Sequence, residues 1–114
     1  MSDAIIQHGV LKQYTGSEAV AVVPDGVQEI GYGAFRGCST VRQVVLPDGV
    51  RRIGSMAFAG CTGLQQVALP PTVAEIGYSA FERCGQLRAI QLPEGLVLLD
   101  RMAFLGCTAL AEIG

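Results

Sequence analysis

The sequence predicts a repeat solenoid, a fold in which short and similar units of chain stack on one another. Three residue types recur at a spacing of 23 residues and in phase: Pro24, Pro47, Pro70 and Pro93; Phe35, Phe58, Phe81 and Phe104; and Cys38, Cys61, Cys84 and Cys107. The alanine before each phenylalanine keeps the same step. A fixed period of this length that preserves several residue types is the signature of a stacked-repeat architecture.

The period divides the chain into a cap and a stack of repeats. Full units run over residues 18–40, 41–63, 64–86 and 87–109, and residues 110–114 begin a fifth unit. Residues 1–17 lie outside the repeat, with apolar pairs on either side of Gly9. Glycine accepts the positive φ of a tight turn, and a stack of repeats needs cover at its first unit. We therefore expect a β-hairpin cap at residues 1–17.

Each unit is expected to contain three pieces, illustrated by the third unit. Residues 64–69 predict a strand, since Val67 and Leu69 are two apart and share a face. Pro70 ends this strand because it has no N–H for a ladder. Residues 73–77 predict a short extended segment. Residues 79–84 predict a single helical turn, because Ala80, Phe81 and Cys84 share one face of a helix.

Composition and charge exclude several classes of protein. Half of the residues are hydrophobic and 16% are charged, which is too apolar for a disordered chain. Proline, glycine or charge interrupts every apolar run, so no membrane insertion is expected. The net charge is −2 with mixed signs, which gives no basic patch for nucleic acid. The N-terminus has no signal-peptide pattern, so the chain is expected in the cytoplasm, or at the cell surface if a leader was removed.

The repeat resembles the BspA-like leucine-rich repeats, also called the Treponema pallidum type. The residues that carry the resemblance, with their counterparts in the other units, are Leu64, Val67, Leu69, Pro70, Val73, Ile76, Gly77, Ala80, Phe81 and Cys84. The resemblance implies an α/β repeat: a right-handed solenoid with a parallel sheet on one face and short extended or helical turns on the other. It also implies protein interaction, and better-known members are bacterial surface adhesins.

The outward positions of the predicted strands form the first candidate binding surface. This strand face consists of Val20, Val22, Gln43, Val45, Gln66, Ala68, Ala89, Gln91 and Glu112. Side by side they make a shallow surface of amides and small apolar groups, almost without charge. Leucine-rich repeat proteins usually bind partners there, while a solvated sheet face without a partner is the alternative.

The fourth unit supplies a second candidate surface. Val97, Leu98, Met102 and Leu105 occupy positions where earlier units carry polar, charged or small residues. An exposed apolar patch of this kind can serve as an interface. The sequence also shows no cap after the last strand, so either further repeats follow or two copies meet end to end as a homodimer.

Few residues in the sequence are candidates for catalysis or metal binding. One cysteine in each unit places the thiols in a column, which favours packed free thiols over a disulfide or a zinc site. Glu29, Arg52 and Glu75 share one unit position and predict a ladder of alternating charge. His8 is the only histidine, and residues 77–81 match only the start of a nucleophile elbow around Ser79.

The sequence therefore predicts a non-enzymatic protein–protein interaction module without cofactor, metal or catalytic residues. The partner is expected to be a protein that contacts the strand face. A fragment of a surface adhesin that binds host matrix or other cells is the alternative, and a small hydrolase is the remote one.

Overall fold

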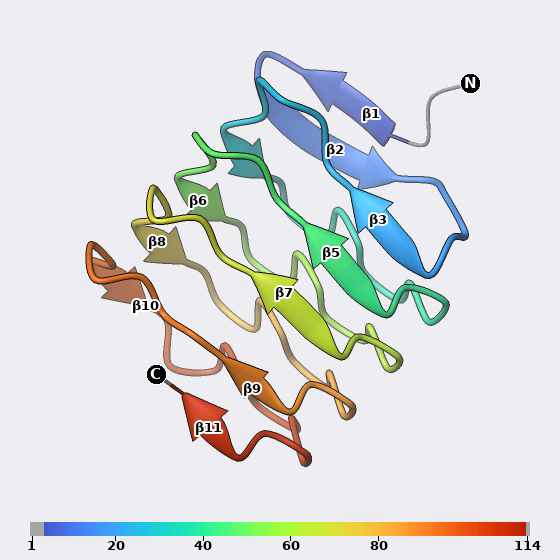
Figure 1. Ribbon diagram of the computed structural model, residues 1–114, viewed down its shortest axis with the longest axis vertical. Helices are drawn as coiled ribbons and strands as arrows, with labels where there is room; N and C mark the ends of the chain where they lie inside the picture. Colours follow the sequence, from blue (N-terminus) through green and yellow to red (C-terminus); the bar gives the residue numbers. More distant parts are fainter. Residues whose placement is uncertain (1–3, 114) are drawn as a thin grey trace.

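The computed structural model describes residues 4–113, which coil into a solenoid of short strands measuring 36 × 29 × 18 Å (Figure 1). The strands are β1 (Ala4–Gln7), β2 (Val10–Tyr14), β3 (Val20–Val22), β4 (Glu29–Ile30), β5 (Gln43–Val45), β6 (Arg52–Ile53), β7 (Gln66–Ala68), β8 (Glu75–Ile76), β9 (Ala89–Ile90), β10 (Leu98–Leu99) and β11 (Glu112–Ile113). Each turn of the solenoid contributes one strand to each of two sides. No helix occurs among these residues.

The strands stack in the register that the repeat predicts. One side holds β3, β5 and β7 in a parallel sheet, and β9 and β11 in a second small sheet below it. The other side is a single sheet in the order β1-β2-β4-β6-β8-β10. Partners in the parallel ladders between repeat units lie 23 residues apart, as Ile30, Ile53 and Ile76 do. The short extended segments of the sequence thus form a parallel sheet of their own.

The predicted helical turn is wrong, and with it the α/β class. Residues 79–84 form consecutive tight turns, in which the N–H groups of Glu82 and Cys84 each bond the carbonyl three residues earlier. The N–H groups that alternate with these bond the next unit instead. Phe81 donates to Ala103 at 2.8 Å, and Arg83 donates to Leu105 at 2.7 Å. A helix cannot form because every second donor is used between units. The architecture is therefore a β-solenoid.

The N-terminal hairpin covers the first unit as predicted. Strands β1 and β2 pair antiparallel around His8 and Gly9, whose φ angles are 53° and 77°. Two successive positive φ values produce the turn whose twist matches a hairpin. Strand β2 then pairs in parallel with β4, and Tyr14 stacks on Phe35 at a ring distance of 4.8 Å. The hairpin thus extends both the sheet and the core.

A column of aromatic rings forms the centre of the core. Phe35, Phe58 and Phe81 are fully buried, and successive rings stack along the solenoid axis. The inward isoleucines and valines of the strands pack around them. Because each ring is covered by the rings of the neighbouring units, no single unit could bury its own phenylalanine.

The fourth unit packs less closely than the others. The ring distance is 4.8 Å between Phe35 and Phe58, and grows to 5.5 Å between Phe81 and Phe104. A Cβ atom at Gly54 or Gly77 would lie 2.8 or 2.9 Å from the backbone of the preceding turn. The fourth unit carries Asp100 at this position, and we attribute the looser packing to the Cβ atom that aspartate adds.

Candidate functional site

The strand face lies on one side of the solenoid, across β3, β5, β7 and β9. Its apolar members are well exposed: Val20 by 48%, Val22 by 68% and Val45 by 38%. Gln43 is half-buried, and Gln66, Ala68, Ala89 and Gln91 are exposed. The backbone of Glu112 belongs to β11, while its side chain lies outside the described part of the chain. The residues that the sequence groups together thus share one surface.

Charged residues flank this surface along both edges. Arg42 and Arg88 precede β5 and β9, whereas Asp48 and Glu94 follow the same strands, and all four are exposed. The ion pairs between described residues involve other arginines, Arg52 and Arg83. The strand face is therefore neutral along its middle, and the guanidinium groups on one edge form no ion pair with another described residue. This edge of arginines was not predicted from the sequence, although Arg42 and Arg88 occupy the same position in their units.

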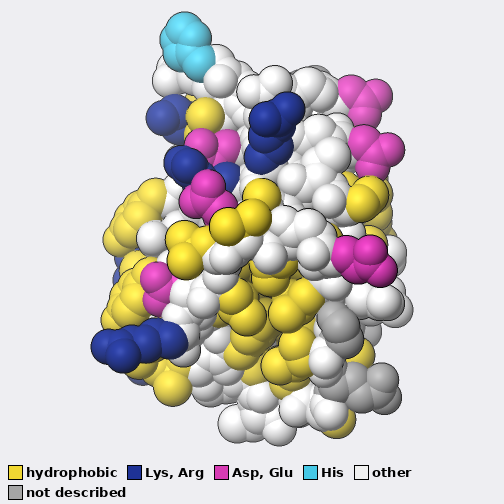
Figure 2. Space-filling model, turned by 90° about the vertical axis from the view of Figure 1, so that its left-hand side faces the viewer, with side chains coloured by type: hydrophobic (Ala, Val, Ile, Leu, Met, Phe, Trp, Pro, Cys, Tyr) yellow, Lys and Arg dark blue, Asp and Glu magenta, His cyan; other side chains and the backbone are white. Residues whose placement is uncertain are grey.

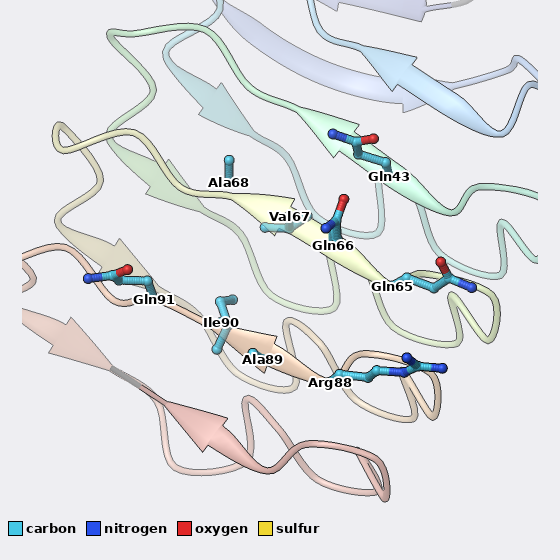
Figure 3. A pocket seen from close by; sticks show the side chains of 9 residues that line it. All are labelled: Gln43, Gln65, Gln66, Val67, Ala68, Arg88, Ala89, Ile90 and Gln91. Atoms are coloured by element: carbon cyan, nitrogen blue, oxygen red, sulfur yellow. The ribbon is translucent and has the colours of Figure 1, made fainter.

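A depression of about 520 Å³ occupies the lower part of the strand face. Its polar members are Gln43, Gln65, Gln66, Arg88 and Gln91, and its floor consists of Val67, Ala68, Ala89 and Ile90. Figure 3 shows that the side chains of Gln65 and Arg88 extend in the same direction from the beginnings of β7 and β9. The depression is shallow and open, so it suits an extended surface contact better than an enclosed small molecule.

The sheet is interrupted beneath this depression. Gln65 donates its N–H to Arg42 at 2.7 Å, and Ala111 donates to Arg88 at 2.9 Å, as the register requires. The corresponding bond from Arg88 to Gln65 is absent, and no backbone hydrogen bond joins β7 to β9 within residues 4–113. The N–H of Arg88 and the carbonyl of Gln65 are thus left without a hydrogen-bond partner among these residues.

The second candidate surface, formed by Val97, Leu98, Met102 and Leu105, is also exposed. Val97 is 84% exposed, Leu98 and Leu105 are each 50% exposed, and Met102 is half-buried. Figure 2 shows charged side chains gathered toward the N-terminal end of the solenoid and hydrophobic side chains exposed toward its C-terminal end. Strand β10 lies at the edge of its sheet in the described chain.

The predicted charge ladder is present on the β4-β6-β8 side. Arg52 lies 3.8 Å from the carboxylate of Glu29 and 3.4 Å from that of Glu75. All three side chains are at least one third exposed, so the pairs are screened by solvent and contribute little to stability. They line a shallow hollow with His8, and this arrangement of one arginine between two carboxylates leaves no carboxyl pair for acid–base chemistry.

The cysteine column is a packing element with a hydrogen-bonding role. The thiols of Cys61, Cys84 and Cys107 donate to the carbonyls of the phenylalanines 26 residues earlier, at 3.1, 3.2 and 2.9 Å. Cys61 and Cys84 are fully buried. The neighbouring thiols of Cys107 and Cys61, together with burial, raise the pKa of Cys84. A thiol held protonated in this way is a poor nucleophile and a poor metal ligand.

The residues considered for catalysis do not form a site. Ser79 is fully buried, and its Oγ has no hydrogen-bond partner among the described residues. His8 is exposed and lies in the turn of the N-terminal hairpin. No group of three metal-ligating side chains comes together within the described range. No helix in that range is long and apolar enough to cross a membrane.

The 23-residue register, the stacked phenylalanines and the exposed strand face define a leucine-rich-repeat solenoid. A model of the BspA type leucine rich repeat region matches residues 14–114 as six copies. The chain belongs to this family.

Solved structures support the assignment. The Treponema pallidum leucine-rich repeat protein is 31% identical with a TM-score of 0.71, and the match covers 91% of this chain and 62% of that one. A leucine-rich repeat protein from Bacteroides capillosus is 26% identical with a TM-score of 0.79, covering 91% and 83%. A leucine-rich cell surface protein from Faecalibacterium prausnitzii is 29% identical with a TM-score of 0.64, covering 91% and 34%. No curated protein sequence matches the chain.

Proposed function

We propose that the chain is a non-enzymatic protein-binding module that contacts its partner through the strand face. The observation that carries this proposal is the exposure of Val20, Val22 and Val45 on the same side of the solenoid as the amides of Gln43, Gln66 and Gln91. Aliphatic groups supply area that water leaves on contact, while amides supply hydrogen bonds that fix orientation. The family consists of repeat proteins that commonly act as interaction modules, which supports the same function.

Site-specific cross-linking tests the proposal. A photoreactive amino acid at Val45 should give discrete protein adducts in the cells that make the protein. The same group at Arg51, which is exposed near the opposite sheet, serves as the matched control and should give none. Equal adducts from both positions, or none from Val45, would contradict a role for the strand face.

A surface adhesin that binds host matrix or other cells is the second candidate. It is favoured by the similarity to the Faecalibacterium prausnitzii protein, which is described as a cell surface protein. We propose that the full-length gene product is then displayed outside the cell. Protease treatment of intact cells should remove an epitope within residues 18–109 if the adhesin function is correct, and should spare it if the module works inside the cell.

We further propose that two copies associate through Val97, Leu98, Met102 and Leu105, together with the edge of β10. A two-fold axis across the solenoid end would bring two β10 edges together in antiparallel orientation. Sedimentation should show a dimer that Leu98→Glu dissociates. A monomer at high concentration would contradict this arrangement.

A further inference from the structure

We propose that the open edge of β3 binds an extended polypeptide segment of a partner protein as an added strand. The segment bonds the free backbone groups of Val20 and Val22, and its inward side chains fill a recess beside the N-terminal hairpin. The inference goes beyond the proposed strand-face function. It concerns the backbone at the rim of that sheet rather than the side chains on its surface, and either site can exist without the other.

The free backbone groups of β3 are the first observation. Strand β3 has one neighbour in the described chain, β5. Val23 donates its N–H to the carbonyl of Val45 at 2.9 Å, and the carbonyl of Ala19 accepts an N–H of β5 at 3.0 Å. Because backbone groups alternate in direction along a strand, those of Val20 and Val22 point to the open edge. Neither residue forms a backbone hydrogen bond at that edge with residues 4–113.

A recess of about 330 Å³ adjoins the open edge. Its lining includes Leu11, Tyr14 and Val23, which are buried, and the edge residues Val20 and Val22. The recess arises because β2 and β1 continue the opposite sheet past the level of β3, whereas no described strand continues the β3 sheet in that direction (Figure 1). An added strand would therefore lie next to β3 with the hairpin behind it, and its alternate side chains would enter an apolar recess.

The spacing of the open groups specifies a polypeptide as the ligand. Val20 and Val22 each present one donor and one acceptor, two residues apart, and an extended chain carries its own groups at the same spacing. Addition of a strand to an exposed sheet edge is an established mode of peptide recognition.

A second copy of this chain fits the edge poorly. Two copies that paired their β3 edges antiparallel in one continuous sheet would share the same inner side. Each hairpin rises past the level of β3 on that side, so it would occupy the place of β4 in the other copy. A single extended segment has no such neighbour, which favours a partner protein.

The charge at the rim orients the segment. Glu18 is exposed, and it is the one charged side chain that lines the recess in the described part of the chain. It forms no ion pair with another residue of that part. A basic residue of the segment would lie beside Glu18, before the start of β3. An exposed pair of this kind adds little affinity, so its role is to set the direction of the segment.

Peptide selection with a matched pair of variants tests the inference. Random peptides of about 10 residues, the upper length of most strands, are selected on the intact chain. Val22→Pro removes an N–H that takes no part in the β3–β5 ladder, and an edge strand accepts proline at such a position. Val22→Thr keeps the N–H and the β-branched shape. Selected peptides should bind Val22→Pro at least about tenfold more weakly than the original chain, and Val22→Thr as the original chain does.

Methylation of the peptide nitrogens tests the backbone pairing without any change in the protein. Alternate amides of an added strand face β3, and the amides between them face solvent. Methylation of the first set should abolish binding, whereas methylation of the second set should leave it unchanged. A peptide whose affinity is insensitive to methylation, or falls equally at every position, would contradict the added strand even if proline disturbed the fold.

The remaining outcomes separate this inference from the strand-face function. Peptides that lose affinity in Val45→Glu but not in Val22→Pro would overturn the edge site and support the strand face. An empty selection would overturn the edge site and leave the strand face to its own cross-linking test. A dimer in sedimentation that Val22→Pro dissociates would assign the edge to a second copy and overturn the assignment of a partner segment.

Discussion

Replacing Phe58 with leucine tests whether the aromatic column holds the units together. Phe58 is fully buried between Phe35 at 4.8 Å and Phe81 at 5.1 Å, so Phe58→Leu removes two ring contacts. Each aromatic pair contributes about 0.5–1.5 kcal/mol beyond its buried area. The substitution should therefore lower the free energy of unfolding by about 1–3 kcal/mol.

Phe104 provides the matched control for this substitution. It is half-buried and has one ring neighbour among the described residues, Phe81 at 5.5 Å. Phe104→Leu should lower the free energy of unfolding by about half as much, roughly 0.5–1.5 kcal/mol. Equilibrium unfolding in urea, followed by circular dichroism, measures both variants at an unchanged slope. An equal or larger loss at Phe104 would refute the idea that stability resides in ring contacts between units.

Two further predictions concern buried polar groups. Ser79→Ala removes a buried hydroxyl that has no hydrogen-bond partner in the part of the chain that the structure describes, so it should raise the free energy of unfolding by about 1–2 kcal/mol. A loss of stability in thermal unfolding experiments would show that the hydroxyl is paired. The pKa of Cys84 is raised in the folded chain, so its contribution is fully present below about pH 8.5 and falls as the pH rises above that value. Urea unfolding should show the contribution of this thiol to stability declining as the pH rises through this range, and a profile that stays the same in Cys84→Ala would contradict the assignment.

Side-chain periodicity was sufficient to predict the repeat and the inward-facing residues, and the turn glycine Gly9 was sufficient to predict the hairpin. Val67, Ile76 and Phe81 are buried, as their recurrence in each unit predicts. In the strands, apolar residue types mark the positions that face inward. The charge ladder of Arg52 was predictable for the same reason, because equal unit positions become neighbours in a stack.

Backbone hydrogen bonding between units was the part that the sequence could not reveal. The spacing of Ala80, Phe81 and Cys84 suits a helical turn, yet the N–H of Phe81 bonds Ala103 in the next unit. The missing hydrogen bond between Arg88 and Gln65 was not predicted either, although Asp100 in place of the glycine of the earlier units was a visible sign of looser packing in the fourth unit. The strand face was therefore predictable from the sequence, whereas the missing hydrogen bonds between β7 and β9 were visible only in the structure.

Amide hydrogen exchange at Arg88 tests the central claim about the strand face most directly, namely that no backbone hydrogen bond joins β7 to β9 among the described residues. The equivalent N–H groups of Arg42, Gln65 and Ala111 donate hydrogen bonds of 2.7, 2.7 and 2.9 Å. The amide of Arg88 should exchange at least about a hundredfold faster than those of Arg42 and Gln65. Equal protection of Arg88 in the free protein would show that the sheet is continuous and would contradict the account.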